Sequence, residues 1–372
     1  MNLERFEKNT MNGSLFPPEL VRIIVENLSY NRPELHALTL VSKTFHWEAM
    51  RLLYRSMTDP EGTRHYNFLV AVRKRPELAE LIHTYHVPTI AHSQKRPLWS
   101  LILRSLLLMV NLKELAYLRL FAIPLTPFPG VRKGQKMPFQ LETFIWTIGW
   151  RGPWDMCPFH PTKTLQFLET QHELRYLRWS YGLPEMSIAY SLPEMSIAPN
   201  IVPKLKILYS SFNAIQAFLP CRTITDLFWE GPTSPATSYL ILKLKEFSGL
   251  RAVSLPGDVW STLTDPRVEG KISPLNTIKV LELRSAIKIH KILPIIAMFP
   301  CLKRLIITPD DPHSGNITER YPEADIFSLY EQSSNLIYVD VRISDIFFKR
   351  WINKLLSPDM VIIPYDRVLE LE

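Results

Sequence analysis

Residues 15–57, LFPPELVRIIVENLSYNRPELHALTLVSKTFHWEAMRLLYRSM, decide how the first part of the chain folds. At about 100° per residue, the segment from Pro18 to Leu28 gathers its polar side chains in a narrow arc and spreads its apolar ones over roughly 200°. A helix that faces a single core needs an apolar stripe of only about 100°. The segment therefore predicts a helix with more apolar surface than one core can cover.

Two further helices are predicted in the same stretch. Pro33 suits the first position of a second helix, and Ser42 suits the N-cap of a third. Apolar residues at helical spacing are Leu35, Leu38 and Val41 in the second helix and Phe45, Ala49, Leu52 and Leu53 in the third. A unit of about 40 residues is rarely stable alone without disulfides, metal or a partner. Either the rest of the chain or a partner protein is expected to cover it.

The residues of this stretch match a known motif in one register. The motif begins with Leu-Pro, Glu-Leu, Ile and Leu, and these places are held here by Phe16-Pro17, Glu19-Leu20, Ile23/Ile24 and Leu28. The match continues through Leu35, Leu38, Val41, Ser42, Lys43 and Phe45. It ends in the last helix with Ala49, Leu53 and Tyr54. The stretch resembles an F-box, the helical motif that docks onto the Skp-type adaptor of cullin-RING ubiquitin ligases. It departs from the family at Phe16, usually Leu, and at Phe45, usually Trp. The resemblance implies adaptor contacts by Pro17, Leu20, Ile23, Ile24, Leu28, Leu35, Leu38 and Val41.

Beyond residue 57 a short pattern, apolar-x-x-apolar-x-apolar, recurs at intervals of 19 to 34 residues. Its copies begin at Leu115, Leu141, Leu174, Leu205, Ile224, Leu250, Ile278, Leu302 and Leu336, and the copy at Leu205 lacks the last apolar residue. The last two apolar positions alternate, as in a strand that buries one face. Stretches between copies, such as 163–173 and 288–299, have apolar residues at helical spacing. Units of a strand and a helix must stack to bury a core.

This part of the chain resembles the divergent leucine-rich-repeat region that follows the F-box in many fungal F-box proteins. The expected fold class is α/β, a three-helix F-box followed by an irregular leucine-rich-repeat-like solenoid; a generic α/β domain with leucine-rich strands remains the alternative. The expected domains are a flexible tail at 1–14, the F-box at 15–57, and the solenoid with its C-terminal cap at 58–372. Residues 68–87 are expected to open the solenoid with a helix and a strand, and residues 344–356 to close it with a helix.

Three stretches interrupt the repeat. The segments 124–138 and 309–322 are rich in turn-forming residues and are expected to be loops. The sequence LPEMSIA occurs twice, at 183–189 and 192–198. An insertion tolerated in a loop explains this duplication better than a dedicated docking peptide does.

No catalytic or metal-binding motif is found. The 12 glycines form no phosphate-binding loop, and the three cysteines are widely spaced, which favours a reducing compartment. His83 and His86 would lie on opposite faces of a predicted strand, so they cannot bind one ion with His92. Cys157 and His160 could act as thiol and base, but an isolated Cys and His in a proline-rich turn are common and do not indicate nucleophilic catalysis. We expect no metal, no cofactor and no enzymatic activity.

The chain carries a formal net charge of +7, yet its basic residues are scattered. The densest run, Arg73 to Arg75, precedes a proline and suits the last turn of a helix. The longest apolar run is too short and too polar to span a bilayer, and no secretory signal is present. A cytoplasmic or nuclear protein is therefore expected, without membrane contact and without a strong case for nucleic acid.

The expected function is that of a substrate-recognition subunit of an SCF-type ubiquitin ligase, which joins an unknown protein substrate to the Skp-type adaptor and, through it, to the cullin-RING ligase. The alternatives are a repeat-protein scaffold outside the ligase and an RNA- or phosphate-binding solenoid. Residues between the buried positions of each strand would form an exposed face, unless helices or loops cover it. The expected substrate-binding residues on this face are Tyr117, Arg119, Tyr176, Arg178, Tyr209, Phe228, Arg304 and Tyr338.

Overall fold

The structure is a computed structural model of mixed α/β class. It describes residues 16–28, 31–58, 62–87, 95–120, 136–148, 161–181, 197–218, 222–230, 249–257, 274–284, 288–309, 321–344, 346–357, 360–363 and 368–369. The chain divides into two compact units, Met1–Leu118 with Lys136–Leu141 and Arg119–Gln135 with Glu142–Glu372. This division does not coincide with the predicted boundary at residue 57, because the helical stretch shares its compact unit with the first strands.

The first unit opens with the three predicted helices, α1 (Pro18–Asn27), α2 (Arg32–Leu38) and α3 (Lys43–Arg55). The Oγ of Ser42 accepts a hydrogen bond from the backbone N–H of Phe45 at 3.4 Å, which confirms Ser42 as the N-cap of α3. The three helices share a small apolar core of Val21, Val25, Leu35 and Ala49, with Leu28, Leu38, Phe45, Leu52 and Leu53 partly buried against it.

A short parallel sheet follows in the first unit. Its elements are β1 (Ser56–Met57), α4 (Gly62–Lys74), α5 (Pro76–Ala79), β2 (Thr84–Val87), α6 (Lys95–Leu106) and β3 (Glu114–Leu120). β2 pairs in parallel with both β1 and β3. The expected helix and strand of residues 68–87 are both present, and α4 ends at Lys74 just before Arg75 and Pro76.

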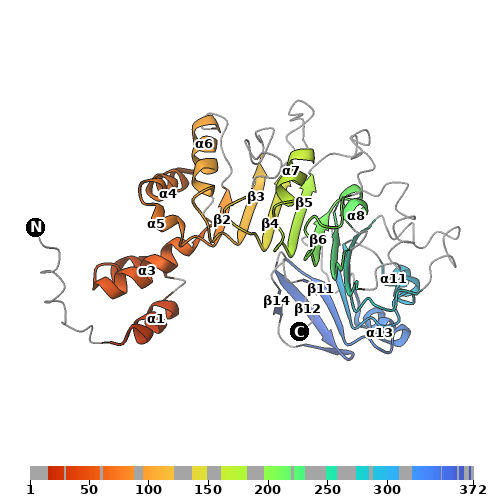
Figure 1. Cartoon of the computed structure of the whole chain (residues 1–372). Coiled ribbons are helices and arrows are strands. Elements are labelled where there is room, and N and C mark those ends of the chain that lie inside the picture. The colour runs from red at the N-terminus through yellow and green to blue at the C-terminus, as the bar shows by residue number, and fades with distance from the viewer. Residues whose placement is uncertain are drawn as a thin grey trace, which may run out of the picture. The chain divides into compact units, whose positions relative to one another are not determined.

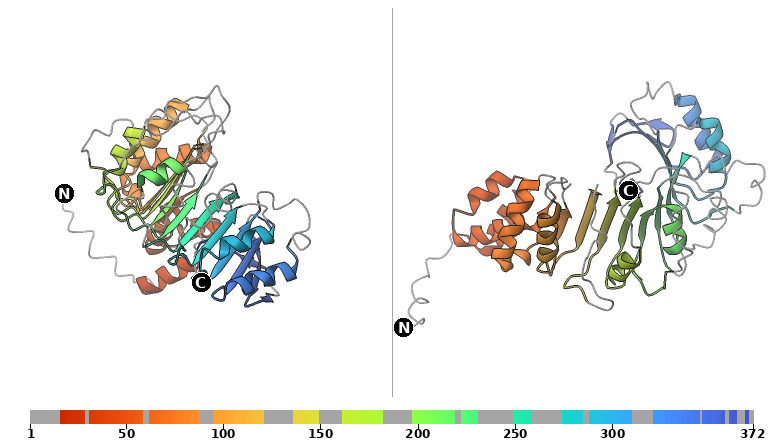
Figure 2. Two further views of the ribbon diagram at one scale, coloured as in Figure 1. Left: turned by 90° about the vertical axis from the view of Figure 1, so that its right-hand side faces the viewer. Right: turned by 90° about the horizontal axis from the view of Figure 1, so that it is seen from above.

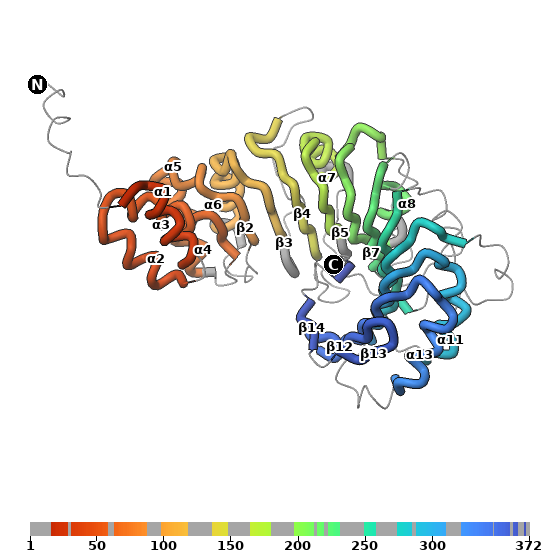
Figure 3. The backbone as a smooth tube through the Cα atoms, turned by 90° about the horizontal axis from the view of Figure 1, so that it is seen from below, coloured from red at the N-terminus to blue at the C-terminus, as the bar shows by residue number. Residues whose placement is uncertain are grey.

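The second unit contains strands that pair in the order in which they occur in the chain (Figure 3). They are β4 (Thr143–Ile148), β5 (Tyr176–Tyr181), β6 (Ile207–Ser210), β7 (Asp226–Trp229), β8 (Ala252–Pro256), β9 (Val280–Arg284), β10 (Arg304–Thr308) and β11 (Tyr338–Arg342). Each pairs in parallel with the next. Every copy of the recurring pattern thus contains a strand, and in the second unit each strand begins two residues after the first apolar residue of its copy.

Helices lie along one face of this sheet (Figures 1 and 2). They are α7 (Pro161–Leu168), α8 (Phe212–Phe218), α11 (Ile289–Ile296) and α13 (Glu323–Gln332). α11 buries Ile289, Ile292, Ile295 and Ile296, which stand at the spacing of one helical face. The predicted helical stretches 163–173 and 288–299 each contain one of these helices.

The expected closing helix over 344–356 is wrong. This segment forms an antiparallel hairpin of β12 (Phe347–Ile352) and β13 (Leu355–Leu356), and β14 (Val361–Ile362) also pairs with β12. Asn353 and Lys354 at the turn have φ of 49° and 74°, which is the backbone of a tight hairpin turn. β12 also pairs antiparallel with β11, so aromatic and β-branched residues extend the sheet instead of entering a helix.

Several expectations fall outside the described residues. The loops at 124–138 and 309–322 and the two LPEMSIA copies are almost wholly in this category, as are His92, Cys157, His160 and the tail at 1–14.

Candidate docking surfaces

The first candidate surface consists of the exposed large apolar residues of the helical stretch 16–55, a set that we call the helical patch. Its members are large side chains that stand in contact with solvent: Phe16, Leu20, Ile23, Ile24, Leu40, Val41 and Trp47. In α1, Val21 and Val25 are one helical turn apart and point into the core, so Leu20, Ile23 and Ile24 are left outside. Ile23 is 54% exposed and Leu40 is 88% exposed. The surplus apolar arc expected for this helix is therefore present and uncovered within the chain's described residues.

The predicted adaptor-binding residues divide into three groups. Pro17, Leu20, Ile23, Ile24 and Val41 are exposed, whereas Leu28 and Leu38 are half-buried against the helical core. Leu35 is 1% exposed, so the expectation that it presents its side chain to a partner is wrong. It lies in the core because it is on the side of α2 that faces Val21 and Val25, with Leu38 packed beside it.

Apart from Phe16, which matches a place of the motif without being among the predicted contacts, two exposed residues of the helical patch were missed. Leu40 lies just after the end of α2, and Trp47 lies off the face of α3 that Phe45 and Ala49 share. A large apolar residue off the predicted core face was the signal that could have identified both.

Ion pairs join α1 to α3. Glu26 Oε1 accepts hydrogen bonds from Arg22 Nε and Arg51 Nη2, both at 2.9 Å, and Arg51 Nε also donates to Glu48. The hydrogen bonds from Arg22 and Arg51 hold the pKa of the Glu26 carboxyl below its ordinary value. All four side chains keep contact with solvent, with exposed fractions of 28–61%, so these ion pairs contribute little to stability.

The second candidate surface is the sheet face opposite the helices. The predicted alignment is confirmed within the second unit: one row across the strands reads Arg178, Tyr209, Phe228, Ser254, Glu282, Ile306 and Asp340. The neighbouring row reads Tyr176, Ile207, Asp226, Ala252, Val280, Arg304 and Tyr338. Parallel pairing without slippage therefore brings these distant residues together.

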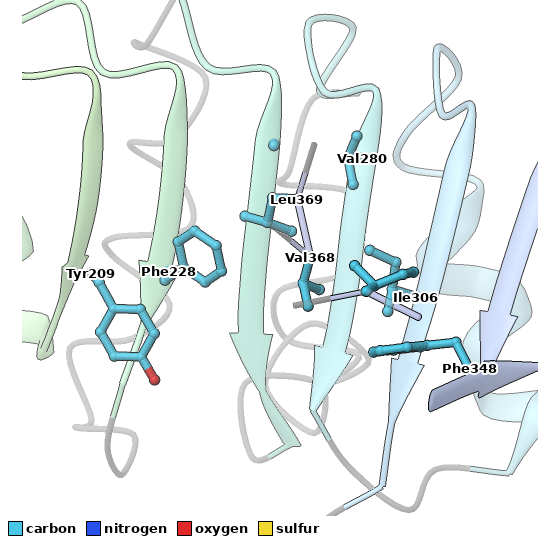
Figure 4. Close-up of a cluster of buried hydrophobic side chains, with 9 residues drawn as sticks. Tyr209, Phe228, Val280, Ile306, Phe348, Val368 and Leu369 are labelled. Atoms are coloured by element: carbon cyan, nitrogen blue, oxygen red, sulfur yellow. The ribbon is translucent and has the colours of Figure 1, made fainter. Parts of the chain in front are cut away.

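The expectation that this face is exposed is wrong over most of its length. Tyr209, Phe228, Ala252, Val280 and Ile306 form a buried cluster with residues from the end of the chain, namely Phe348, Ile363, Val368 and Leu369 (Figure 4). We call the five sheet residues the covered face. Periodicity along a strand cannot reveal this cover, because the covering residues are far away in the sequence.

The predicted substrate-binding residues differ in exposure accordingly. Tyr176, Arg178 and Tyr338 are half-buried, while Tyr209, Phe228 and Arg304 are buried. In the first unit, Tyr117 is buried and its ring lies 5.9 Å from that of Trp99. Arg119 lies in β3, but its side chain is outside the described residues.

Buried charges on the sheet face are paired across strands. Asp340 accepts hydrogen bonds from Arg304 Nε and Arg350 Nε, both at 2.7 Å, and all three side chains are nearly inaccessible. Arg178 lies over the ring of Tyr209, with 4.2 Å from its guanidinium carbon to the ring centroid. The Thr308 hydroxyl donates to Glu282 Oε1 at 2.7 Å.

Within the described ranges, no three His, Cys, Asp or Glu side chains are grouped so that they could hold a metal ion. His86 Nε2 instead lies 2.7 Å from Glu114 Oε1. None of the described helices is both long enough and apolar enough to cross a bilayer.

Comparison of the sequence with protein-family models and with curated proteins finds no match. The two surfaces therefore have to be interpreted from their own chemistry.

Proposed function

We propose that this protein is the substrate-recognition subunit of an SCF-type cullin-RING ubiquitin ligase. The helical stretch 15–57 docks as an F-box on the Skp-type adaptor, and the strand-helix units after it, a divergent leucine-rich-repeat solenoid, hold the protein to be ubiquitinated. The transfer chemistry belongs to the partner subunits, so this chain has no catalytic residue of its own.

The observation that carries the proposal is the helical patch. The three helices bury a core of their own, yet seven large apolar side chains between Phe16 and Trp47 remain exposed. So many exposed large apolar residues within one short helical stretch favour an interaction site, since isolated ones would need no explanation. Pro17, Leu20, Ile23, Ile24 and Val41 are among the exposed residues of this stretch and hold positions of the F-box pattern.

The order of the strands supports the second half of the proposal. Parallel strands that pair in chain order, with helices on one face, are the arrangement expected of stacked strand-helix repeats. A nucleic-acid site would need a nearly unbroken basic stripe. Asp226, Glu282 and Asp340 interrupt the rows of the sheet face, which argues against the RNA-binding alternative.

Adaptor binding tests the proposal directly. The double variant Leu20→Asp/Ile23→Asp places two charges on the exposed side of α1 and leaves the core residues Val21 and Val25 in place. Each apolar side chain buried in an interface contributes about 1.5–3 kcal/mol, so affinity for a purified Skp-type adaptor should fall at least about 100-fold. Isothermal titration calorimetry gives the affinities.

The matched control is Leu355→Asp, which puts the same charge on an apolar residue that is 75% exposed in β13. It should bind the adaptor like the wild type. Equal binding by the double variant would remove the F-box assignment. A folded wild-type chain with no affinity for the adaptor would favour the scaffold alternative.

A further inference from the structure

The end of the chain lies on the sheet face where a partner would be expected. Val368 is 1% exposed and Leu369 is 4% exposed, and both belong to the cluster built on the covered face. In the view of Figure 4, Leu369 lies between Phe228 and Val280, and Val368 lies between Leu369 and Ile306. Two adjacent aliphatic side chains thus fill the space over the middle strands of the sheet.

The covered face differs in chemistry from the face that packs on the helices. On the helix side, one row across the strands is entirely apolar: Leu177, Leu208, Leu227, Val253, Leu281, Leu305 and Val339. The opposite face carries Ser254 and Glu282, which are register partners on β8 and β9 and are 0% and 1% exposed. The helix side also buries one serine, Ser210, but its hydroxyl donates to the carbonyl of Trp179 at 2.6 Å and is therefore satisfied.

Val368 and Leu369, the described residues of the covering segment, leave these two groups unsatisfied. Among the residues that the structure describes, neither Ser254 Oγ nor Glu282 Oε2 has a hydrogen-bond partner, although Glu282 Oε1 accepts from Thr308. Burying a hydroxyl or a carboxylate oxygen without a partner costs free energy. An occupant that supplied donors at these positions would bind better than the C-terminal residues do.

We infer that the covered face is the binding site for an extended segment of a partner protein that carries two adjacent aliphatic side chains and donates hydrogen bonds toward Ser254 and Glu282. The C-terminal residues hold this site until the partner displaces them. The identification of that partner as the ligase substrate rests on the proposed function. The peptide site itself does not.

A peptide supplied in trans tests the site. The chain is truncated after Ile363, and a fluorescent peptide of residues 364–372, PYDRVLELE, is the probe. The truncated chain should bind it saturably by fluorescence anisotropy. A peptide with Leu369→Asp should bind at least about 10-fold more weakly, because its charge would enter the apolar cluster. The full-length chain should also bind at least about 10-fold more weakly, because its tethered copy competes at high effective concentration.

Two variants tie the result to the covered face and to folding. Ala252→Phe in the truncated chain fills the space and should abolish peptide binding. Leu369→Ala in the full-length chain weakens the binding of the tethered copy and should raise the affinity for the added peptide at least several-fold. This variant keeps the whole chain, so it avoids the unfolding that truncation could cause.

Peptide selection tests the expected chemistry of the partner segment. Selection of random peptides on the truncated chain should enrich adjacent aliphatic residues, and the enriched peptides should bind more weakly when the chain carries Glu282→Ala.

Three results would overturn the inference. The first is a folded truncated chain, with unchanged circular dichroism, that does not bind the peptide. The second is loss of folding on truncation together with no gain of affinity in Leu369→Ala, which would make the segment ordinary core. The third is a full-length dimer that becomes monomeric on truncation, which would assign the site to a second copy of the chain. The adaptor is absent from all these assays, so they remain informative whether or not it binds.

Discussion

Asp340 lies directly opposite Arg350 across the antiparallel pair β11–β12, and its Oδ1 accepts a hydrogen bond from Arg350 Nε at 2.7 Å. The other carboxylate oxygen accepts from Arg304 of the neighbouring parallel strand. One buried carboxylate thus joins the C-terminal hairpin to the strands before it. The hairpin provides Phe348, which belongs to the cluster with Val368 and Leu369, so this charge network supports the arrangement of the covered face.

Asp340→Ala should lower the free energy of unfolding by about 3–5 kcal/mol, because it leaves two buried arginines without their carboxylate. Urea denaturation measures the loss. The matched control is Glu26→Ala, which also removes a carboxylate shared by two arginines but on a solvated surface, and should change stability little. Similar losses in both variants would contradict the role of burial.

Two buried tyrosines should respond oppositely to removal of the hydroxyl. Tyr330 donates a hydrogen bond to the carbonyl of Trp351 at 2.9 Å, so Tyr330→Phe should destabilise the chain by about 1 kcal/mol. Tyr85 is fully buried and its hydroxyl has no hydrogen-bond partner among the described residues, so Tyr85→Phe should be neutral or stabilising. Thermal unfolding of both variants compares them, and a clear loss in Tyr85→Phe would reveal a missed partner.

The stability of the chain should decrease in alkali through Tyr85. Burial raises the pKa of the Tyr85 hydroxyl well above its ordinary value near 10. The folded chain therefore keeps this proton after the unfolded chain has lost it. The resulting stabilisation is fully present below pH 10 and falls by about 1.4 kcal/mol per pH unit above it. In Tyr85→Phe the free energy of unfolding, measured with denaturant, should therefore fall less steeply between pH 10 and 11 than in the wild type. An unchanged dependence on pH would contradict this.

The turn at Asn353 and Lys354 should accept glycine with a gain in stability. Lys354 has φ of 74°, a left-handed conformation that costs a non-glycine residue about 1 kcal/mol. Lys354→Gly should therefore raise the free energy of unfolding by up to about 1 kcal/mol, while Lys354→Val should lower it. If both substitutions shift the urea midpoint in the same direction, the turn does not have this geometry.

The half-buried residues of the sheet face should affect capture of a substrate more than folding. Tyr176→Ala/Arg178→Ala removes the guanidinium that lies on Tyr209 but leaves the covered face intact. Under the proposed function, recovery of ubiquitinated client proteins should fall, while adaptor affinity and the melting temperature stay nearly unchanged. Arg75→Ala, an exposed arginine paired with Glu77, is the control. Global unfolding of the double variant would mean that these residues are core.

Local pattern was sufficient for most of the helices and for the parallel strands, and for the exposed side of the first helix. The apolar arc of Pro18 to Leu28 is too wide for one helical face, and the structure leaves Leu20, Ile23 and Ile24 outside the core. Ser42 was identifiable as a cap because hydrogen bonding there involves only a residue three positions away. The strands followed from an alternation within six residues, and the same alternation predicted which residues align across the sheet. All these features depend on neighbours along the chain.

Tertiary structure alone decided the end of the chain. The apolar residues of 344–356 fit helical spacing, yet pairing with β11 and the turn at Asn353 make them a hairpin. Alternation predicted the side of the sheet on which Tyr209, Phe228 and Ile306 lie, but not that Val368 and Leu369 bury them. Which distant segment covers a face depends on long-range packing and on the free energy of burying apolar surface, and neither leaves a periodic trace in the sequence of the covered strand.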